Sequence, residues 1–294
     1  MLNSDPRTLL TKYGLHAKKS WGQNFLIDER AYRMIVAACN LGPDDVAIEI
    51  GAGLGTLTSR LLATGAQVIA VERERDMCDV LRSELGSEPR FVLREENALN
   101  LELASLELPT KPVVVGNLPY QIATPLIFHF LEQRAQLRHL VIMLQREVAD
   151  RLLAAAGSEH YSALSAQVQI IGTVERVCNV GRGGFLPAPK VESTVVRVRP
   201  IPEGTRVPLR DLKTYSAVVR AAFSQRRKTL RNALGAMFGD GGVALMAQTG
   251  IDLGRRGETL AVAEFARLAD AVADLALPEK GEVAQIPTEP TAQG

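Results

Sequence analysis

The sequence has few of the residues that bind metals. It contains only three cysteines and four histidines in 294 residues. The cysteines are far apart, no Cys-x-x-Cys pair occurs, and the histidines show no metal-ligand spacing. An odd number of scattered cysteines next to apolar residues is typical of small buried side chains in a reducing cytosol. We therefore expect a cytoplasmic protein with no metal site.

Long apolar segments and a strong net charge are also lacking. The hydrophobic runs are too short to cross a bilayer, and no secretory signal is recognisable, so we expect no membrane association. The net charge is only +1, but residues 212–239 contain no acidic side chain. The basic side chains of that segment are Lys213, Arg220, Arg226, Arg227, Lys228 and Arg231. Such a segment is either a solvated helix face or a phosphate-binding surface.

Strand and helix patterns alternate along the first part of the chain. Buried strands are predicted at residues 46–50, 67–71, 90–93, 113–115 and 140–144, with helical spacing between them. This alternation indicates an α/β fold with a mostly parallel sheet and right-handed crossovers. Later strand patterns, at residues 167–171, 174–180 and 194–198, predict an antiparallel edge of the same sheet.

The rest of the chain has a different pattern. Residues 200–204 have the composition of a linker, and only helical spacing follows them. From residue 278 onward large apolar side chains are missing. We predict a first domain over residues 1–203 with a basic N-terminal segment, a small all-helical domain over 204–277 and a disordered tail over 278–294.

A turn at residues 116–120, Gly-Asn-Leu-Pro-Tyr, follows the predicted strand at 113–115. Glycine and proline stop the strand and fix a turn at its carboxyl end, where open α/β sheets bind ligands. The turn presents an amide, a carbonyl group placed by proline and an aromatic ring. Such a set can hold a flat nitrogen base, because the ring stacks on it and two oxygens accept hydrogen bonds from an exocyclic amine.

A glycine-rich turn at residues 49–55, Glu-Ile-Gly-Ala-Gly-Leu-Gly, joins a predicted strand to a helix. Its glycines would let a ligand approach the backbone closely. A dinucleotide fingerprint needs a further glycine at position 56, which is Thr56, so the pattern suits a ligand without pyrophosphate, such as S-adenosylmethionine. Glu72 ends the next strand and can accept hydrogen bonds from both ribose hydroxyls. NAD enzymes have an acid at the same position, so Glu72 does not distinguish the two cofactors. The alternative is that the glycine-rich turn is purely structural and binds no ligand.

Asn97 and Ala98 follow the third predicted strand. The Asn97 oxygen could accept a hydrogen bond from the adenine amine of a cofactor while the Ala98 amide donates to a ring nitrogen. Taken alone, these residues favour the alternative, in which Asn97 caps the turn that follows.

Five blocks of sequence together resemble the rRNA adenine N6-dimethyltransferases. They are residues 22–26, 49–55, 117–120, 185–193 and 222–232, in that order. The last block is similar to the bacterial small-subunit branch, and the resemblance extends from about residue 12 to about residue 275. It implies a Rossmann-like class I S-adenosylmethionine-dependent methyltransferase sheet with a helical C-terminal domain. It also implies dimethylation of two adjacent adenosines in the 3′-terminal hairpin loop of small-subunit rRNA, within the immature 30S subunit.

The resemblance implies a set of cofactor contacts spread over several blocks. Together with the reasoning above, it gives Gln23, Asn24, Leu26, Gly51, Gly53, Glu72, Asn97, Ala98 and Asn117 as residues that contact S-adenosylmethionine. The family usually has an acid where this chain has Asn97. An amide still accepts a hydrogen bond but lacks the charge assistance of a carboxylate, which neighbouring Glu96 could supply.

For the chemical step, we expect Asn117 Oδ1 and the Leu118 carbonyl, set by Pro119, to accept hydrogen bonds from the target amine. Tyr120 would stack on the flipped-out adenine and Phe185 would cover its other face. No strong base is required, because the nitrogen can lose its proton after methylation. Positioning and electrostatics then supply most of the rate. Considered alone, Tyr120 could be an aromatic residue of a turn, and Phe185 could be a residue of the core.

Six basic residues are expected to contact RNA phosphates: Lys18, Lys19, Arg226, Arg227, Lys228 and Arg231. The sequence gives no sign of oligomerisation, so we expect a monomer. Three other functions fit parts of the pattern. They are a large-subunit rRNA adenine methyltransferase that confers antibiotic resistance, a non-catalytic assembly factor on the same fold, and a glutamine or DNA-adenine methyltransferase.

Overall fold

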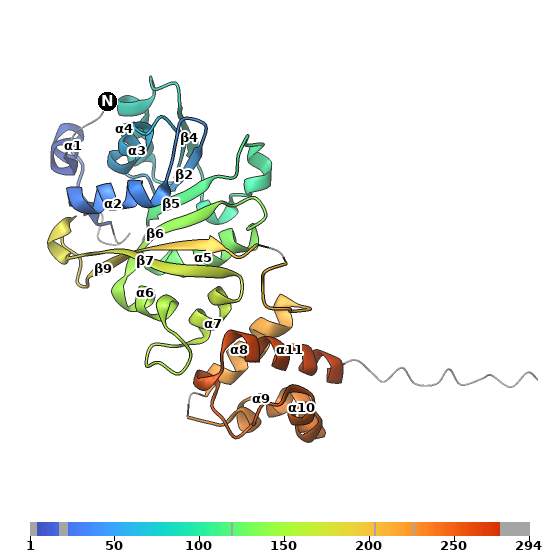
Figure 1. Ribbon diagram of the computed structural model, residues 1–294. Helices are drawn as coiled ribbons and strands as arrows, with labels where there is room; N and C mark the ends of the chain where they lie inside the picture. The colour runs from blue at the N-terminus through green and yellow to red at the C-terminus, as the bar shows by residue number, and fades with distance from the viewer. Residues whose placement is uncertain (1–4, 18–22, 119, 203, 226, 277–294) are drawn as a thin grey trace, which may run out of the picture. The chain divides into compact units, whose positions relative to one another are not determined.

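The computed structural model in Figure 1 describes residues 5–17, 23–118, 120–202, 204–225 and 227–276. The side chains of Tyr120, Gln121 and Ala276 are not described. The chain divides into two compact units, residues 1–206 and residues 207–294. The predicted tail at 278–294 lies outside the described residues.

The first unit is built on a seven-stranded sheet. Its strands run in the order β4 (Phe91–Glu95), β3 (Gln67–Glu72), β2 (Val46–Ile50), β5 (Val113–Asn117), β6 (His139–Gln145), β9 (Ser193–Pro200) and β7 (Gly172–Val180). Neighbours from β4 to β6 are parallel, and β9 is antiparallel to β6 and to β7. Every residue of β2 is buried, as expected for a strand covered on both faces. The predicted mostly parallel sheet with an antiparallel edge is confirmed.

Helices cover both faces of this sheet (Figure 1). One face packs against α2 (Glu29–Cys39), α3 (Thr56–Leu62) and α4 (Arg75–Leu85). The other packs against α5 (Tyr120–Glu132), α6 (Arg146–Leu153) and α7 (Ala163–Gln169). Across the sheet, the chain moves from β2 to β3 to β4 in one direction, and from β5 to β6 in the opposite direction. Because parallel crossovers are right-handed, this reversal moves the helices to the opposite face.

The reversal makes a topological switch point between β2 and β5, and ligands of open α/β sheets bind outside the carboxyl ends of the strands at such a point. Gly116 lets the two strands approach there. A Cβ at this position would lie 2.8 Å from the Ile50 carbonyl oxygen and 2.9 Å from Leu118 Cδ2. Glycine is therefore the residue that fits the end of β5.

The N-terminal segment joins the sheet unit through a small second sheet. Strand β1 (Phe25–Leu26) pairs antiparallel with β8 (Phe185–Leu186) in the β7–β9 connection. Before it, α1 (Pro6–Tyr13) packs Leu9 against Met77 of α4. The sequence reading had no helix there.

Two predicted elements differ in the structure. The strand predicted at residues 167–171 is wrong, because residues 163–169 form α7 instead. Ser162 and Ser165 form a capping box at the start of that helix, and short apolar runs do not distinguish a strand from a buried helix. The sequence also indicates a helix over about residues 146–156, and in the structure α6 ends at Leu153.

The regular secondary structure in the described residues of the second unit is all helical. It comprises α8 (Leu212–Ser224), α9 (Leu230–Phe238), α10 (Gly242–Thr249) and α11 (Val262–Ala276). The Phe265 ring packs edge-on against Tyr215, with centroids 6.5 Å apart, in a core of fully buried side chains. Short 3-10 turns complete the chain: η2 (Ala98–Asn100), η3 (Leu103–Leu106), η4 (Arg182–Gly184), η5 (Gly239–Gly241) and η6 (Gly257–Thr259). None of the described helices is long and apolar enough to cross a membrane.

Candidate active site

A cavity of about 460 Å³ opens at the switch point of the sheet, a volume typical of small-molecule sites. Its wall is made by β1 and the residues before it, the glycine-rich turn, the ends of β3 and β5, and the loop after β4. All the residues predicted to contact the cofactor line it: Gln23, Asn24, Leu26, Gly51, Gly53, Glu72, Asn97, Ala98 and Asn117. The structure therefore brings these residues together. Their individual contacts with a cofactor stay predictions.

Glu72 ends β3 and accepts three backbone hydrogen bonds. Its Oε1 accepts from the amides of Arg73 at 2.8 Å and Glu74 at 2.9 Å, and its Oε2 accepts from Gly53 at 2.9 Å. The carboxylate is 8% exposed, so these bonds fix its orientation toward the cavity. A carboxylate has about four acceptor positions, which leaves capacity for ligand hydroxyls.

The glycine-rich turn is shaped by positive φ angles. Gly53 has φ +56° and Gly55 has φ +78°, a region that other residues rarely adopt. A Cβ at Gly55 would also lie 2.9 Å from Leu81 Cδ2, so glycine lets α3 begin close to α4. The turn thus aims the Gly53 amide at Glu72 and keeps its own backbone along the cavity wall.

Glu49 lies on β2 and is 2% exposed, yet its Oε2 has no hydrogen-bond partner among the described residues. Burial raises the pKa of Glu49 to about 8; the nearby Thr58 hydroxyl opposes this, and the charge of Glu72 adds to it. Neither Glu49 Oε2 nor Thr58 Oγ1 makes a hydrogen bond of normal geometry. A carboxyl group of this kind in a cavity wall fits a ligand that brings its own positive charge.

Asn97 acts as the cap that its sequence context favours. Its Oδ1 accepts a hydrogen bond of 3.2 Å from the Leu99 amide at the start of η2, while the residue also lines the cavity. Glu96 lines the cavity too and pairs with Arg94. A carbonyl-type oxygen has a second acceptor position, so capping η2 leaves Asn97 able to accept one hydrogen bond from a ligand.

Asn117 ends β5 with its amide tied to the N-terminal segment. Its Nδ2 donates to the Asn24 carbonyl oxygen at 3.1 Å. Because a carbonyl can only accept, this bond identifies the nitrogen end of the amide and leaves Oδ1 as the acceptor for a ligand. Leu118 follows it, is 3% exposed and also lines the cavity.

Phe185 is a buried residue of the first unit. Its side chain is 4% exposed and packs in the core beneath α2, and it is not part of the cavity wall. It lies directly opposite Leu26 in the β1–β8 pair. Its proposed place over the second face of a target base stays a prediction. Pro119 and the Tyr120 side chain lie outside the described residues.

The predicted phosphate contacts fall into two groups. Lys18, Lys19 and Arg226 lie outside the described residues. Arg227, Lys228 and Arg231 are exposed where α8 leads into α9 in the helical unit. No group of three His, Cys, Asp or Glu side chains that could hold a metal occurs in the described parts of the chain.

Some residues of the cavity wall had no role in the sequence reading. Glu49 could have been noticed, since it is a charged residue inside an otherwise apolar strand. Tyr32 and Glu74 gave no signal, because a tyrosine on an amphipathic helix and a glutamate before one are ordinary. Only the packing of α2 and the end of β3 brings them to the cavity.

Two solved structures resemble this chain over 85% of its length. A dimethyladenosine transferase from Plasmodium falciparum superposes with a TM-score of 0.70 at 26% identity, covering 85% of this chain and 98% of that chain. The 23S rRNA methyltransferase ErmE gives a TM-score of 0.66 at 24% identity, over 85% of this chain and all of that chain, and at this identity indicates the fold alone. The predicted class I S-adenosylmethionine-dependent methyltransferase fold is confirmed.

Relatives of known name are closer in sequence. The Ribosomal RNA small subunit methyltransferase A of Marinobacter nauticus is 43% identical over 263 residues, which cover 90% of this chain and 94% of the relative. The protein of that name from Anaeromyxobacter sp. is 46% identical over 281 residues, 90% of this chain and 96% of the relative. The family model described as ribosomal RNA adenine dimethylase matches residues 14–274. The chain belongs to the ribosomal RNA adenine dimethylase family.

Proposed function

We propose that the protein transfers methyl groups from S-adenosylmethionine to N6 of two adjacent adenosines in the 3′-terminal hairpin of small-subunit rRNA. The observation that carries this proposal is the meeting of two sites at one sheet edge. The cavity between the glycine-rich turn and Glu72 ends at Asn117, whose amide oxygen is left as an acceptor by its bond to Asn24. The relatives named for small-subunit methylation favour that substrate over large-subunit rRNA.

The cavity fits S-adenosylmethionine by its chemistry. Glu72, already held by three backbone amides, would accept hydrogen bonds from the ribose hydroxyls. Glu49, whose buried Oε2 has no hydrogen-bond partner among the described residues, suits a cationic ligand, and the Ala98 amide with Asn97 would take the adenine edge. When bound, the cofactor supplies an electrophilic methyl group on a sulfonium.

Asn117 is the residue that would act on the target base. The lone pair of an exocyclic aromatic amine is delocalised into the ring, so transfer requires that nitrogen to become more pyramidal. Asn117 Oδ1 and the Leu118 carbonyl would accept its two hydrogens and favour that geometry. The nitrogen then loses a proton after methylation, with no dedicated base. Pro119 and the stacking ring of Tyr120 remain part of the proposal on sequence grounds.

The helical unit would dock the enzyme on its substrate. Arg227, Lys228 and Arg231 are exposed in a segment without acidic residues, which suits phosphate contacts. We infer that the substrate is the immature 30S subunit and that the protein acts as a monomer. Replacing the three residues by glutamine should lower the slope of log K against log salt by about 2–3, at roughly 0.7–0.9 for each phosphate that is no longer neutralised. The matched control, Arg210→Gln, removes a basic side chain that already pairs with Asp274.

Methylation of isolated particles tests the proposal. The protein, labelled S-adenosylmethionine and unmethylated 30S subunits should give label in small-subunit rRNA, at nucleotides where primer extension stops because dimethyladenine cannot pair. Large-subunit RNA, DNA and protein should stay unlabelled. Asn117→Ala should abolish transfer and leave subunit binding nearly intact. Label in 50S particles alone would contradict the substrate, and normal methylation by Asn117→Ala would contradict the chemistry.

A further inference from the structure

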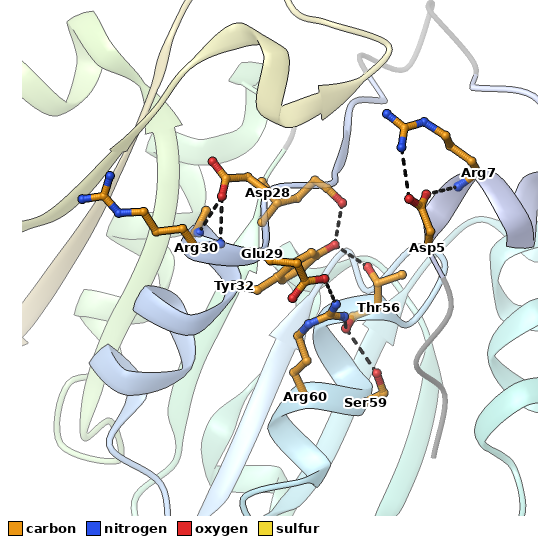
Figure 2. A network of polar contacts seen from close by, with 11 residues as sticks. Asp5, Arg7, Asp28, Glu29, Arg30, Tyr32, Thr56, Ser59 and Arg60 are labelled. Carbon is orange, nitrogen blue, oxygen red and sulfur yellow. Dashed lines mark hydrogen bonds and ion pairs between the residues drawn. The ribbon is translucent and has the colours of Figure 1, made fainter.

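Tyr32 joins three elements of the active site through one buried hydroxyl. It lies on α2, is 2% exposed, and lines the cavity. Its hydroxyl bonds the Leu26 carbonyl oxygen at 2.6 Å and Thr56 Oγ1 at 2.7 Å (Figure 2). The carbonyl can only accept, so the tyrosine proton goes to Leu26 and the Thr56 hydroxyl donates to Tyr32. Burial raises the pKa of Tyr32 to about 12, which keeps that proton in place.

Arg60 holds the tyrosine from the other side. Its guanidinium lies over the Tyr32 ring, 4.0 Å from the centroid, and its Nη1 donates to the Thr56 carbonyl oxygen at 2.6 Å. It also pairs with Glu29 of α2, as Figure 2 shows. The ring is therefore fixed by packing and a cation–π contact that do not depend on the hydroxyl.

The two atoms that the hydroxyl binds belong to two different segments of the cavity wall. Thr56 is the first residue of α3, directly after the glycine-rich turn. Leu26 ends the cavity-lining segment of residues 23–26, whose Asn24 carbonyl accepts from Asn117. One hydroxyl thus links the cofactor wall to the segment that orients the amide at the end of β5.

We propose that Tyr32 is a positioning residue for methyl transfer, whose hydroxyl holds residues 23–26 against the glycine-rich turn. The role rests on the proposed function, since it is the cofactor cavity that this bond shapes. Without the hydroxyl, the Leu26 carbonyl is left without its buried partner and the segment populates other arrangements. A ligand must then restore the competent arrangement, so its apparent Kd rises by the inverse of the competent fraction.

Tyr32→Phe tests this role, because it removes one oxygen and keeps the ring under Arg60. Calorimetric titration of the full chain with S-adenosylhomocysteine should show a Kd about tenfold higher, the scale expected for one buried hydrogen bond. The KM for 30S subunits should stay within about twofold, since the phosphate contacts proposed for Arg227, Lys228 and Arg231 lie in the helical unit. Tyr161→Phe removes the same atom from a tyrosine that is also fully buried but is not part of the cavity wall. The Tyr161→Phe variant should bind S-adenosylhomocysteine with the same Kd as the wild type.

Substitutions at Thr56 test the same role independently. Thr56→Ser keeps the donor and should bind as the wild type does, while Thr56→Val should reproduce the weaker binding. The double variant Tyr32→Phe/Thr56→Val should be no weaker than either single one, because both remove the same link. An unchanged Kd for Tyr32→Phe, or an equal rise in Kd for Tyr161→Phe, would overturn the positioning role alone. A wild-type protein that fails to bind S-adenosylhomocysteine would instead refute the proposed function.

Discussion

Replacing Glu49 by glutamine should make the protein's stability less dependent on pH. Burial holds the pKa of Glu49 at about 8 in the folded protein, against an ordinary value of 4.5. Between these values the folded chain retains a proton that the unfolded chain releases. The free energy of unfolding therefore falls as the pH rises from about 4.5 to about 8 and levels off above that.

The size of the effect follows from the two pKa values. Each pH unit between them corresponds to about 1.4 kcal/mol, so complete ionisation of Glu49 costs about 4–5 kcal/mol. Glutamine has nearly the same shape and resembles the protonated acid, so it avoids this cost. Between pH 5.5 and pH 7.5 the variant should gain about 2–3 kcal/mol over the wild type.

Urea unfolding followed by circular dichroism, at several pH values for both proteins, measures the difference. Other titrating groups are the same in the two chains and cancel. Parallel curves from pH 5.5 to pH 8.5 would refute the assignment of a raised pKa to Glu49. A cationic ligand beside Glu49 should also favour its ionised form, so S-adenosylmethionine should release more protons from the wild type than from Glu49→Gln near pH 7. Calorimetry in buffers of different ionisation enthalpy counts those protons.

Further substitutions test other parts of the fold. Gly116→Ala should destabilise the fold by about 1–3 kcal/mol, since its Cβ would lie 2.8 Å from a backbone oxygen. Gly235→Ala should stabilise the fold slightly, because open space surrounds that position in α9. Thermal melting compares the two variants. Glu72→Gln should lose about 1–3 kcal/mol in urea unfolding, because an amide nitrogen would face backbone donors. Burial and the charge of Arg138 lower the pKa of His139 to about 4. As the pH falls from 6.5 to 4, the wild type should therefore lose up to about 3 kcal/mol of its free energy of unfolding. His139→Gln should abolish that part of the acid dependence in the same urea assay.

Local pattern was sufficient for the central sheet. β2 and β5 are short, β-branched or apolar runs that end in glycine-rich turns, so both the strands and their ligand-facing ends could be read from sequence. The same logic failed at residues 167–171, where an apolar run belongs to the end of α7 and the residues after it. There a capping serine outweighed strand propensity, which is a weak guide in short segments.

Side-chain direction was beyond the reach of sequence. Phe185 sits in a motif that resembles the family's, and no pattern in the sequence shows that its side chain packs in the core beneath α2. The role of Tyr32 depends on α2 packing beside the glycine-rich turn, a contact between segments that no periodicity encodes. Motifs therefore located the cavity, while the tertiary contacts decided which members of a motif face it.

The choice of an amide at position 117 follows from the two bonds required of it. One end must donate to the Asn24 carbonyl, which fixes the orientation, and the other must accept from the target amine. A carboxylate can only accept, so Asp at this position would repel the Asn24 carbonyl. A carboxylate would also add a negative charge to a cavity wall that already contains the acids Glu49 and Glu72. The acids suit a cationic cofactor, whereas a neutral base approaching it needs an oriented dipole, and asparagine supplies one without further charge.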